Sequence, residues 1–270
     1  METKNILITG VSSGIGRACA EYLAGEGHSI FGTTRNRENN GVTKGNITYI
    51  YMDVRDGESV RAAIEKVTEL SGGIDVLVNN AGMGMGGAIE DTAYGEMAAH
   101  FETNTFGSIN VINEVLPYMR KSGKGHIINI GSVAAYISIP FQAAYSASKA
   151  AITSYTYSLR NEVSPFGIKV SIIHPGDLKT NFTSNRKMTN KSTEDSPYYE
   201  RMMRSLETMA RDEQNGGDPI VIAKAVNRIM SKKNPPIAVT VGIKYKLISF
   251  AFRIVPARIR EAIVASIYAK

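Results

Sequence analysis

The chain has 270 residues, 43% of them hydrophobic and 21% charged, which is the length and composition of one large globular domain. Its single cysteine, Cys19, excludes an intramolecular disulfide framework. No apolar stretch reaches the roughly 20 residues of a membrane-spanning helix, and the N-terminus lacks the apolar core of a signal peptide, so we expect a cytoplasmic protein.

The net charge of +6 is modest, and it is concentrated in two basic segments, residues 179–191 and 244–270. Neither segment shows a groove-reading helix or regularly spaced stacking aromatics, so we expect no binding to nucleic acid. Solvated charged faces, or contact with an anionic ligand or membrane surface, are the alternatives. We also predict no metal site.

Short apolar runs alternate with longer helical patterns along most of the chain. The runs predict buried strands. They lie at residues 5–10, 28–34, 47–54, 75–82, 125–132 and 168–176. Strands that alternate with helices form parallel βαβ units. The sequence therefore predicts a single doubly wound, Rossmann-like α/β domain over residues 1–270, with a central parallel sheet flanked by helices.

Two regions interrupt this alternation. Residues 181–217 form a long polar insertion that carries Met and Tyr, and we interpret it as a lid over the substrate. After a short strand near residues 235–242, residues 243–270 form amphipathic helices interrupted at Pro256.

The segment TGVSSGIG, residues 9–16, joins the first strand to the first helix. Glycines at such a turn let the backbone approach a pyrophosphate, and the helix N-terminus supplies amide donors. A tight turn without a ligand is the alternative. The predicted cofactor-binding residues of this turn are Gly10, Ser12, Ser13, Gly14, Ile15 and Gly16.

Tyr145 and Lys149 are one helical turn apart in YSASK, so the phenol and the ammonium lie on one face among small residues. An ammonium nearby favours the phenolate, which would suit Tyr145 to proton exchange with a substrate oxygen. Ser132 follows the fifth apolar run and is placed to donate a hydrogen bond to the same oxygen. We predict catalysis by these three residues, and substrate binding by Ser132 and Tyr145.

Residues 5 to about 240 resemble the short-chain dehydrogenases/reductases, because several motifs occur in the order of that family. They are TGVSSGIG, Asp53–Val54, NNAG at 79–82, Asn104, Ser132, YSASK and PGDLKT at 175–180. The resemblance implies a nicotinamide cofactor and interconversion of a carbonyl and an alcohol by hydride transfer. It also implies homodimers or homotetramers that pack through helices near residues 104–120 and 148–164.

The same resemblance implies roles for single residues. Asp53 and Val54 would contact the adenine, although Asp53 could instead cap the next helix. Asn104 would hold a water that links Lys149 to solvent, and Lys149 would also hydrogen-bond the nicotinamide ribose. The remaining cofactor contacts implied by the family are Asn80, Ala81 and Gly82 at the adenosine ribose, with Pro175, Gly176 and Thr180 near the nicotinamide.

Arg35 stands about twenty residues after Gly16, at the end of the second apolar run. An acid at this point binds the ribose 2′-hydroxyl of NAD, whereas an Arg accommodates the 2′-phosphate of NADP. We therefore predict NADP(H) rather than NAD(H), although Arg35 could also be a solvated loop residue.

Apolar, flexible segments lie near the predicted lid, including residues 83–88, residues 134–143 and the cluster Tyr198, Tyr199, Met202 and Met203. If they line the pocket rather than pack the lid, a steroid, retinoid or long-chain lipid ketone fits best. A 3-oxoacyl-thioester reductase is the alternative, with Arg186, Lys187 and Lys191 meeting an anionic carrier. A non-catalytic dinucleotide sensor or scaffold is a further alternative.

The tail carries Ile259, Ile263 and Ile267 at four-residue spacing. Its basic residues, from Lys244 to Lys270, outnumber one acid, Glu261. Such a helix can lie on an anionic bilayer. It can also close the pocket or a subunit interface with the same apolar face.

Overall fold

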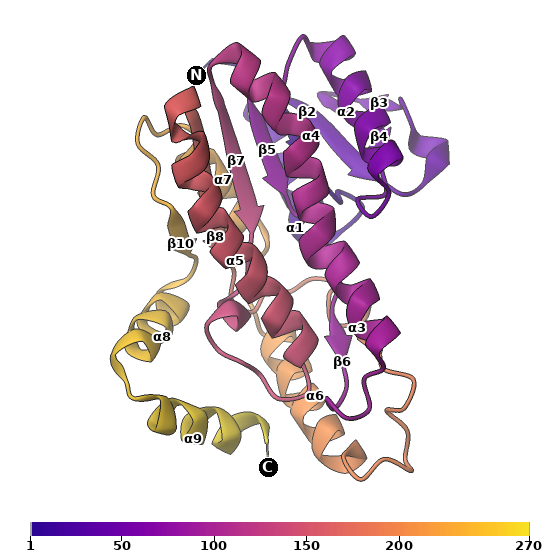
Figure 1. Ribbon diagram of the computed structural model, residues 1–270, viewed down its shortest axis with the longest axis vertical. Coiled ribbons are helices and arrows are strands. Elements are labelled where there is room, and N and C mark those ends of the chain that lie inside the picture. Colours follow the sequence, from indigo (N-terminus) through magenta and orange to yellow (C-terminus); the bar gives the residue numbers. More distant parts are fainter. Residues whose placement is uncertain (1, 270) are drawn as a thin grey trace.

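A computed structural model describes residues 2–269, so Met1 and Lys270 lie outside the described residues. The core is a sheet with the strand order β10-β8-β7-β5-β1-β2-β4-β3 (Figure 1). The strands are β1 (Asn5–Ile8), β2 (Ser29–Thr34), β3 (Thr43–Lys44), β4 (Ile47–Tyr51), β5 (Val76–Asn79), β7 (Gly125–Ile130), β8 (Ile168–His174) and β10 (Ala238–Thr240). The doubly wound α/β prediction is confirmed.

The sheet is parallel except at one edge, where β3 pairs antiparallel with β4. Gly45 adopts a positive φ of 57° in the tight turn between them. Two paired residues are too few to produce a period-2 pattern, so the sequence predicted only a parallel sheet. The antiparallel strand covers the edge of β4.

Helices cover both faces of the sheet. They are α1 (Gly14–Gly25), α2 (Gly57–Ser71), α4 (Gly107–Ser122), α5 (Ala143–Val163) and α7 (Ile220–Met230). Leu7 and Leu77 point to the face under α2, α4 and α5, whereas Ile6 and Val78 point to the face under α1 and α7. Cys19 lies in this second layer and is fully buried. Successive strand residues face opposite sides, so a continuous apolar run buries both layers.

The other elements surround the carboxyl ends of the strands. They are α3 (Tyr94–Phe101), a π-helical turn (Glu102–Phe106), α6 (Tyr199–Gln214), α8 (Ile243–Ile254), α9 (Ala257–Tyr268), and the strands β6 (Met85–Gly86) and β9 (Lys187–Met188), which pair with each other. The insertion 181–217 therefore contains β9 and α6. Figure 1 shows α8 and α9 beside the main body rather than in either helix layer.

Within residues 2–269, no helix has the length and apolar character needed to span a bilayer. In the same range, no three His, Cys, Asp or Glu side chains cluster in a way that would hold a metal ion.

Candidate active site

A cavity of about 900 Å³ lies at the carboxyl ends of the central strands, where open α/β sheets bind ligands. Its wall brings together most residues singled out in the sequence. They are Gly10, Ser12, Ser13, Gly14, Ile15, Arg35, Asp53, Val54, Asn80, Ala81, Gly82, Ser132, Tyr145, Lys149, Pro175, Gly176 and Thr180. Gly16 and Asn104 are not in the wall and lie behind it.

The glycine turn forms one end of the cavity. Gly10 and Gly14 have positive φ values of 73° and 57°. A Cβ on Gly16 would stand 2.1 Å from the carbonyl oxygen of Gly10, so only glycine lets α1 start so close to the turn. The N-cap residue of α1, Ser13, makes no side-chain hydrogen bond to the first helical turn. Together with Gly14 and Ile15 it presents the positive helix end to the cavity, which suits a pyrophosphate.

Asp53 lies at the adenine end of the predicted cofactor site. Its carboxylate accepts from Arg55 Nη2 at 2.5 Å and from Arg55 Nε at 2.9 Å. These hydrogen bonds hold the pKa of Asp53 below its usual range. The interpretation of Asp53 as a helix cap is wrong, because Asp56 caps α2 and accepts from the amide of Glu58 at 3.0 Å.

Asn79 and Asn80, at the end of β5, tie this strand end to helix α4 and to the end of β1, respectively. Asn79 donates to the carbonyl oxygen of Ser108 at 2.8 Å, and Asn80 Nδ2 donates to the carbonyl oxygens of Thr9 and Gly10 at 2.9 and 3.1 Å. Asn80 thereby fixes the start of the glycine turn while it also faces the cavity.

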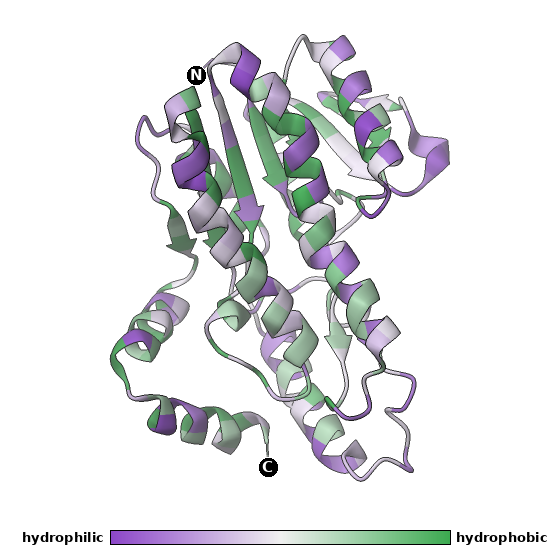
Figure 2. Ribbon diagram, in the orientation of Figure 1, coloured by the Kyte–Doolittle hydropathy of each residue, from purple (hydrophilic) through white to green (hydrophobic). Residues whose placement is uncertain are grey.

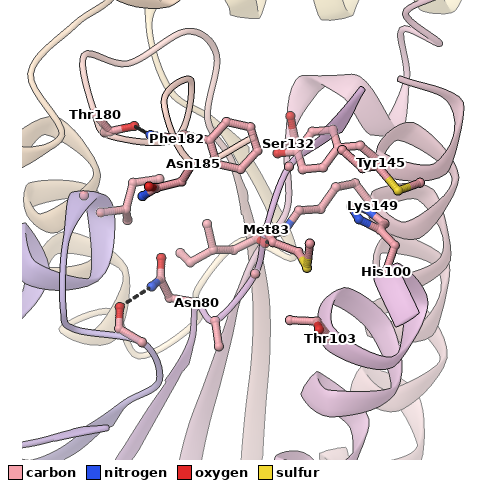
Figure 3. Close-up of a pocket in the computed structure, with 18 of the residues that line it drawn as sticks. Asn80, Met83, His100, Thr103, Ser132, Tyr145, Lys149, Thr180, Phe182 and Asn185 are labelled. Atoms are coloured by element: carbon pink, nitrogen blue, oxygen red, sulfur yellow. Dashed lines mark hydrogen bonds between the residues drawn. The ribbon is translucent and has the colours of Figure 1, made fainter. Parts of the chain in front are cut away.

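The opposite wall carries Ser132, Tyr145 and Lys149 (Figure 3). The Ser132 Oγ accepts from the amide of Ala134 at 3.1 Å, and Ser132 and Tyr145 line the same part of the cavity. Lys149 is buried, and its Nζ donates to the carbonyl oxygen of Ile130 at 2.9 Å. The same Nζ lies 5.8 Å from the centroid of the Tyr145 ring. Helix α5 therefore holds the phenol and the ammonium on one face.

The protonation of this pair differs from the sequence expectation. Burial raises the pKa of the Tyr145 phenol to about 12, although the neighbouring Ser132 side chain acts in the opposite direction. Burial also lowers the pKa of Lys149 to about 8. Within the protein alone, desolvation outweighs the expected pull of the ammonium. Tyr145 is thus protonated at pH 7, which is the form that a general acid needs.

Asn104 lies in the π-helical turn, a feature that is frequent at functional sites. Its Oδ1 accepts from the amide of Met83 at 2.8 Å, and its Nδ2 donates to the carbonyl oxygen of Met83 at 2.9 Å. Asn104 therefore clamps the strand-end loop that carries Met83 against the catalytic helix. Its role in holding a water stays a prediction.

Sequence reasoning missed two buried histidines beside the catalytic wall. His100 Nε2 lies 3.0 Å from Asn104 Nδ2, and its ring makes an edge contact with Tyr145 at a centroid distance of 6.2 Å. His174 lies between the carbonyl oxygen of Ser132, at 3.0 Å, and the hydroxyl of Tyr136, at 2.7 Å. The sequence feature that could have identified His100 was its spacing of four residues from Asn104.

The lid contributes the third side of the cavity. Phe182 packs on the Tyr145 ring with a centroid distance of 5.3 Å. Behind it, Arg186 Nη2 and Glu213 Oε1 form an ion pair at 2.6 Å, with the two side chains 5% and 14% exposed. Thr183 also donates to Glu213. Burial raises the pKa of Glu213 despite these partners.

The cluster of Tyr and Met on α6 packs the lid rather than lining the cavity. Met202 is buried against Leu206 and Met209, with Tyr199 and Met203 packed at its edge. Tyr198 donates to Glu90 at 2.6 Å. Lining by these side chains, one of the two interpretations of the sequence, is wrong.

Comparison with known proteins agrees with this geometry. A family model described as short chain dehydrogenase matches residues 4–191. The chain is 42% identical over 242 residues to a 3-ketodihydrosphingosine reductase of Bacteroides thetaiotaomicron, which covers 90% of this chain and 89% of that protein.

Two solved structures have the same fold. A short-chain dehydrogenase from Streptomyces avermitilis superposes with a TM-score of 0.83 at 32% identity, covering 98% of each chain. A structure of ElxO with NADP bound superposes with a TM-score of 0.74 at 25% identity, covering 91% of this chain and 100% of that one.

Proposed function

The chain belongs to the short-chain dehydrogenase/reductase family, and on that premise we propose that it is an NADP(H)-dependent reductase of a long-chain lipid ketone. The observation that carries the proposal is the wall of Ser132, Tyr145 and Lys149, which shares one cavity with the glycine turn. The cofactor, when bound, supplies a hydride. The chain must supply the proton and hold the substrate oxygen.

The Tyr145 phenol is the proton donor in this proposal. It is protonated at neutral pH, because burial raises its pKa to about 12, and it shares the cavity wall with Ser132. A carbonyl oxygen that accepts from both hydroxyls gains negative charge during reduction, and Tyr145 then transfers its proton to it. The presence of all three residues argues against a non-catalytic sensor or scaffold.

A lipid substrate is supported by the wall around Tyr145. Apolar side chains there include Met83, Met85, Ile139, Phe182 and Met188. The similarity to a 3-ketodihydrosphingosine reductase points the same way. The compound 3-ketodihydrosphingosine is a long-chain ketone with an amino group on the carbon beside its carbonyl carbon. We therefore choose it as the first substrate to test.

The thioester alternative has less support. It relied on Arg186, Lys187 and Lys191 to meet an anionic carrier, but the Arg186 side chain is only 5% exposed and is paired with Glu213. Lys187 and Lys191 are exposed, although Lys187 lines the cavity, and two solvent-exposed lysines form a weak anion site.

NADP(H) is proposed because Arg35 lies in the cavity wall and is exposed. Structures of this fold hold either NAD or NADP, so the fold by itself does not select between them. Arg37 is a matched control, because its guanidinium stacks 4.3 Å from the centroid of the Tyr51 ring and it is not in the wall.

The test measures cofactor consumption with 3-ketodihydrosphingosine, a long-chain ketone without the amine, a steroid ketone, retinal and a 3-oxoacyl thioester. We expect reduction of the first two with NADPH. Arg35→Ser should lower the preference for NADPH over NADH by on the order of tenfold, and Arg37→Ser should not. Strict dependence on a thioester, or a preference for NADH, would overturn the corresponding part of the proposal.

We further propose a homo-oligomer that assembles through the helices α4 and α5. Light scattering at micromolar concentration tests it, and a monomer would contradict it. A cytoplasmic location stays a prediction.

A further inference from the structure

The C-terminal arm, residues 243–269, is held on the protein by its inner side. On α8, the Tyr245 hydroxyl donates to Asp177 Oδ2 at 2.5 Å, and its ring covers Gly176. On α9, Val264 is 4% exposed, and Tyr268 packs beside the Met202 cluster of α6. Both helices therefore have fixed orientations.

The outer side of the arm is apolar and exposed. Four large residues recur along one side of α8 and three along one side of α9. They are Ile243, Leu247, Phe250 and Ile254, which are 63–77% exposed, and Ile259, Ile263 and Ile267, which are 43–52% exposed. Figure 2 shows apolar colouring on both helices of the arm.

This concentration is unusual for the molecule. The arm supplies seven of the sixteen large hydrophobic residues that are exposed within residues 2–269, although it makes up only a tenth of the chain. Scattered apolar residues on a surface need no explanation, but a contiguous set marks a binding surface. The apolar face does not close the cavity, because no residue of the arm is in the cavity wall.

The charge on the arm selects between possible partners. Within residues 243–269 the arm has five basic residues and one acid, Glu261, a net charge of +4. The basic residues are Lys244, Lys246, Arg253, Arg258 and Arg260. A second copy apposed through this face would bring like charges together. Arg253 lies over the Tyr136 ring and Arg260 donates to the Phe252 carbonyl oxygen, whereas Lys244, Lys246 and Arg258 are exposed. Anionic headgroups would neutralise these three while the apolar side chains enter the acyl boundary.

We propose that the outer face of the C-terminal arm docks on an anionic lipid bilayer. Asp177 and Gly176, which Tyr245 contacts, lie in the wall of the cavity. The docked arm therefore places the cavity close to the bilayer from which a lipid ketone would come. The docking does not depend on the proposed substrate, so the two proposals can fail separately.

Sedimentation with vesicles tests the docking. Wild-type protein should sediment with vesicles of phosphatidylcholine and phosphatidylglycerol, and much less with phosphatidylcholine alone. Raising the ionic strength from about 0.01 M to about 1 M shortens the Debye length from about 30 Å to about 3 Å and should release it. The triple variant Leu247→Ser/Phe250→Ser/Ile263→Ser should bind at least about tenfold more weakly.

Matched control variants test whether vesicle binding depends on the arm itself or on exposed apolar and basic residues anywhere on the surface. Leu70→Ser/Phe166→Ser/Val221→Ser removes three exposed apolar residues elsewhere and should bind like wild type. Lys246→Gln/Arg258→Gln should weaken binding more than Lys121→Gln/Lys224→Gln. These are point substitutions because deleting α9 would also remove the buried Val264. The arm variants should keep their activity on detergent-dispersed ketone.

Three results would overturn the proposal. The wild-type protein could fail to sediment, or the triple variant could sediment equally well. The third is a wild-type dimer that the triple variant dissociates without any vesicle binding, which would assign the face to a second copy.

Discussion

Helix α5 and the lid face the same cavity but are built in different ways. On α5, Ala and Ser surround Tyr145 and Lys149, and the Lys149 ammonium donates to the Ile130 carbonyl oxygen. The lid is instead held by the Met202 cluster and by the buried pair Arg186–Glu213. Substitutions on α5 can therefore remove chemistry without loss of structure, whereas substitutions in the lid act first on structure.

Tyr145→Phe tests most directly whether a substitution on α5 removes chemistry without loss of structure. The ring keeps its packing on Phe182 but loses the proton donor. Turnover should fall by about 10² to 10⁴-fold, the range of general-acid effects. Binding of NADPH and the unfolding midpoint should not change. Tyr155→Phe, on the same helix but partly buried against the core and away from the cavity wall, is the control. Near-normal turnover of Tyr145→Phe would remove that residue from the mechanism.

Arg186→Met should act first on stability, whereas Tyr145→Phe acts on turnover. It leaves Glu213 buried without its cation, which should lower the free energy of unfolding by about 3 kcal/mol in urea denaturation. The double variant Arg186→Met/Glu213→Leu should recover most of that loss, because no charge then stays buried. If the unfolding midpoint and the amide exchange of α6 are both unchanged, the pair does not hold the lid.

Lys149→Met tests whether one side chain on α5 serves two functions. We expect about a tenfold loss in turnover and a similar loss in NADPH affinity, since a charged hydrogen-bond donor is removed in both cases. The pKa of Lys149 is lowered to about 8, so the ammonium is present below that pH and lost above it. Wild-type NADPH affinity should therefore fall as pH rises through about 8, measured by fluorescence titration. An equal pH dependence in the variant would contradict this role.

A gradual effect, which accumulates over several pH units, concerns acid stability. Burial lowers the pKa of His126 to about 3 and that of His174 to about 4, from an ordinary value of 6.5. The unfolded chain binds these protons first, so stability is fully present above pH 6.5 and is lost as pH falls towards 4 for His174 and towards 3 for His126. The expected slope is about 1 kcal/mol per pH unit for each histidine. His126→Asn should flatten the slope, and an identical slope would show that His126 does not contribute.

The wall on α5 was predictable because its chemistry requires particular residues at short spacings. Tyr145 and Lys149 are one helical turn apart, and the glycines of the turn must lie within a few residues of each other. The fold followed from apolar runs long enough to show their period.

The packing of the lid and of the arm was less predictable, because it depends on contacts between residues far apart in the sequence. Nothing in the sequence pairs Arg186 with Glu213, which lie 27 residues apart, or places Tyr245 over Gly176. The spacing of Ile259, Ile263 and Ile267 identified one apolar face of α9. It did not show that the helix packs through Val264 and leaves that face exposed.

The burial of Cys19 has a practical consequence for studies of the arm. Burial raises the pKa of its thiol to about 12, so almost no thiolate exists near neutral pH to react with a maleimide or an oxidant. A cysteine introduced at an exposed position such as Leu247 would then be the one reactive thiol in residues 2–269. A fluorophore attached there would report the depth of α8 in a bilayer without prior removal of the native cysteine.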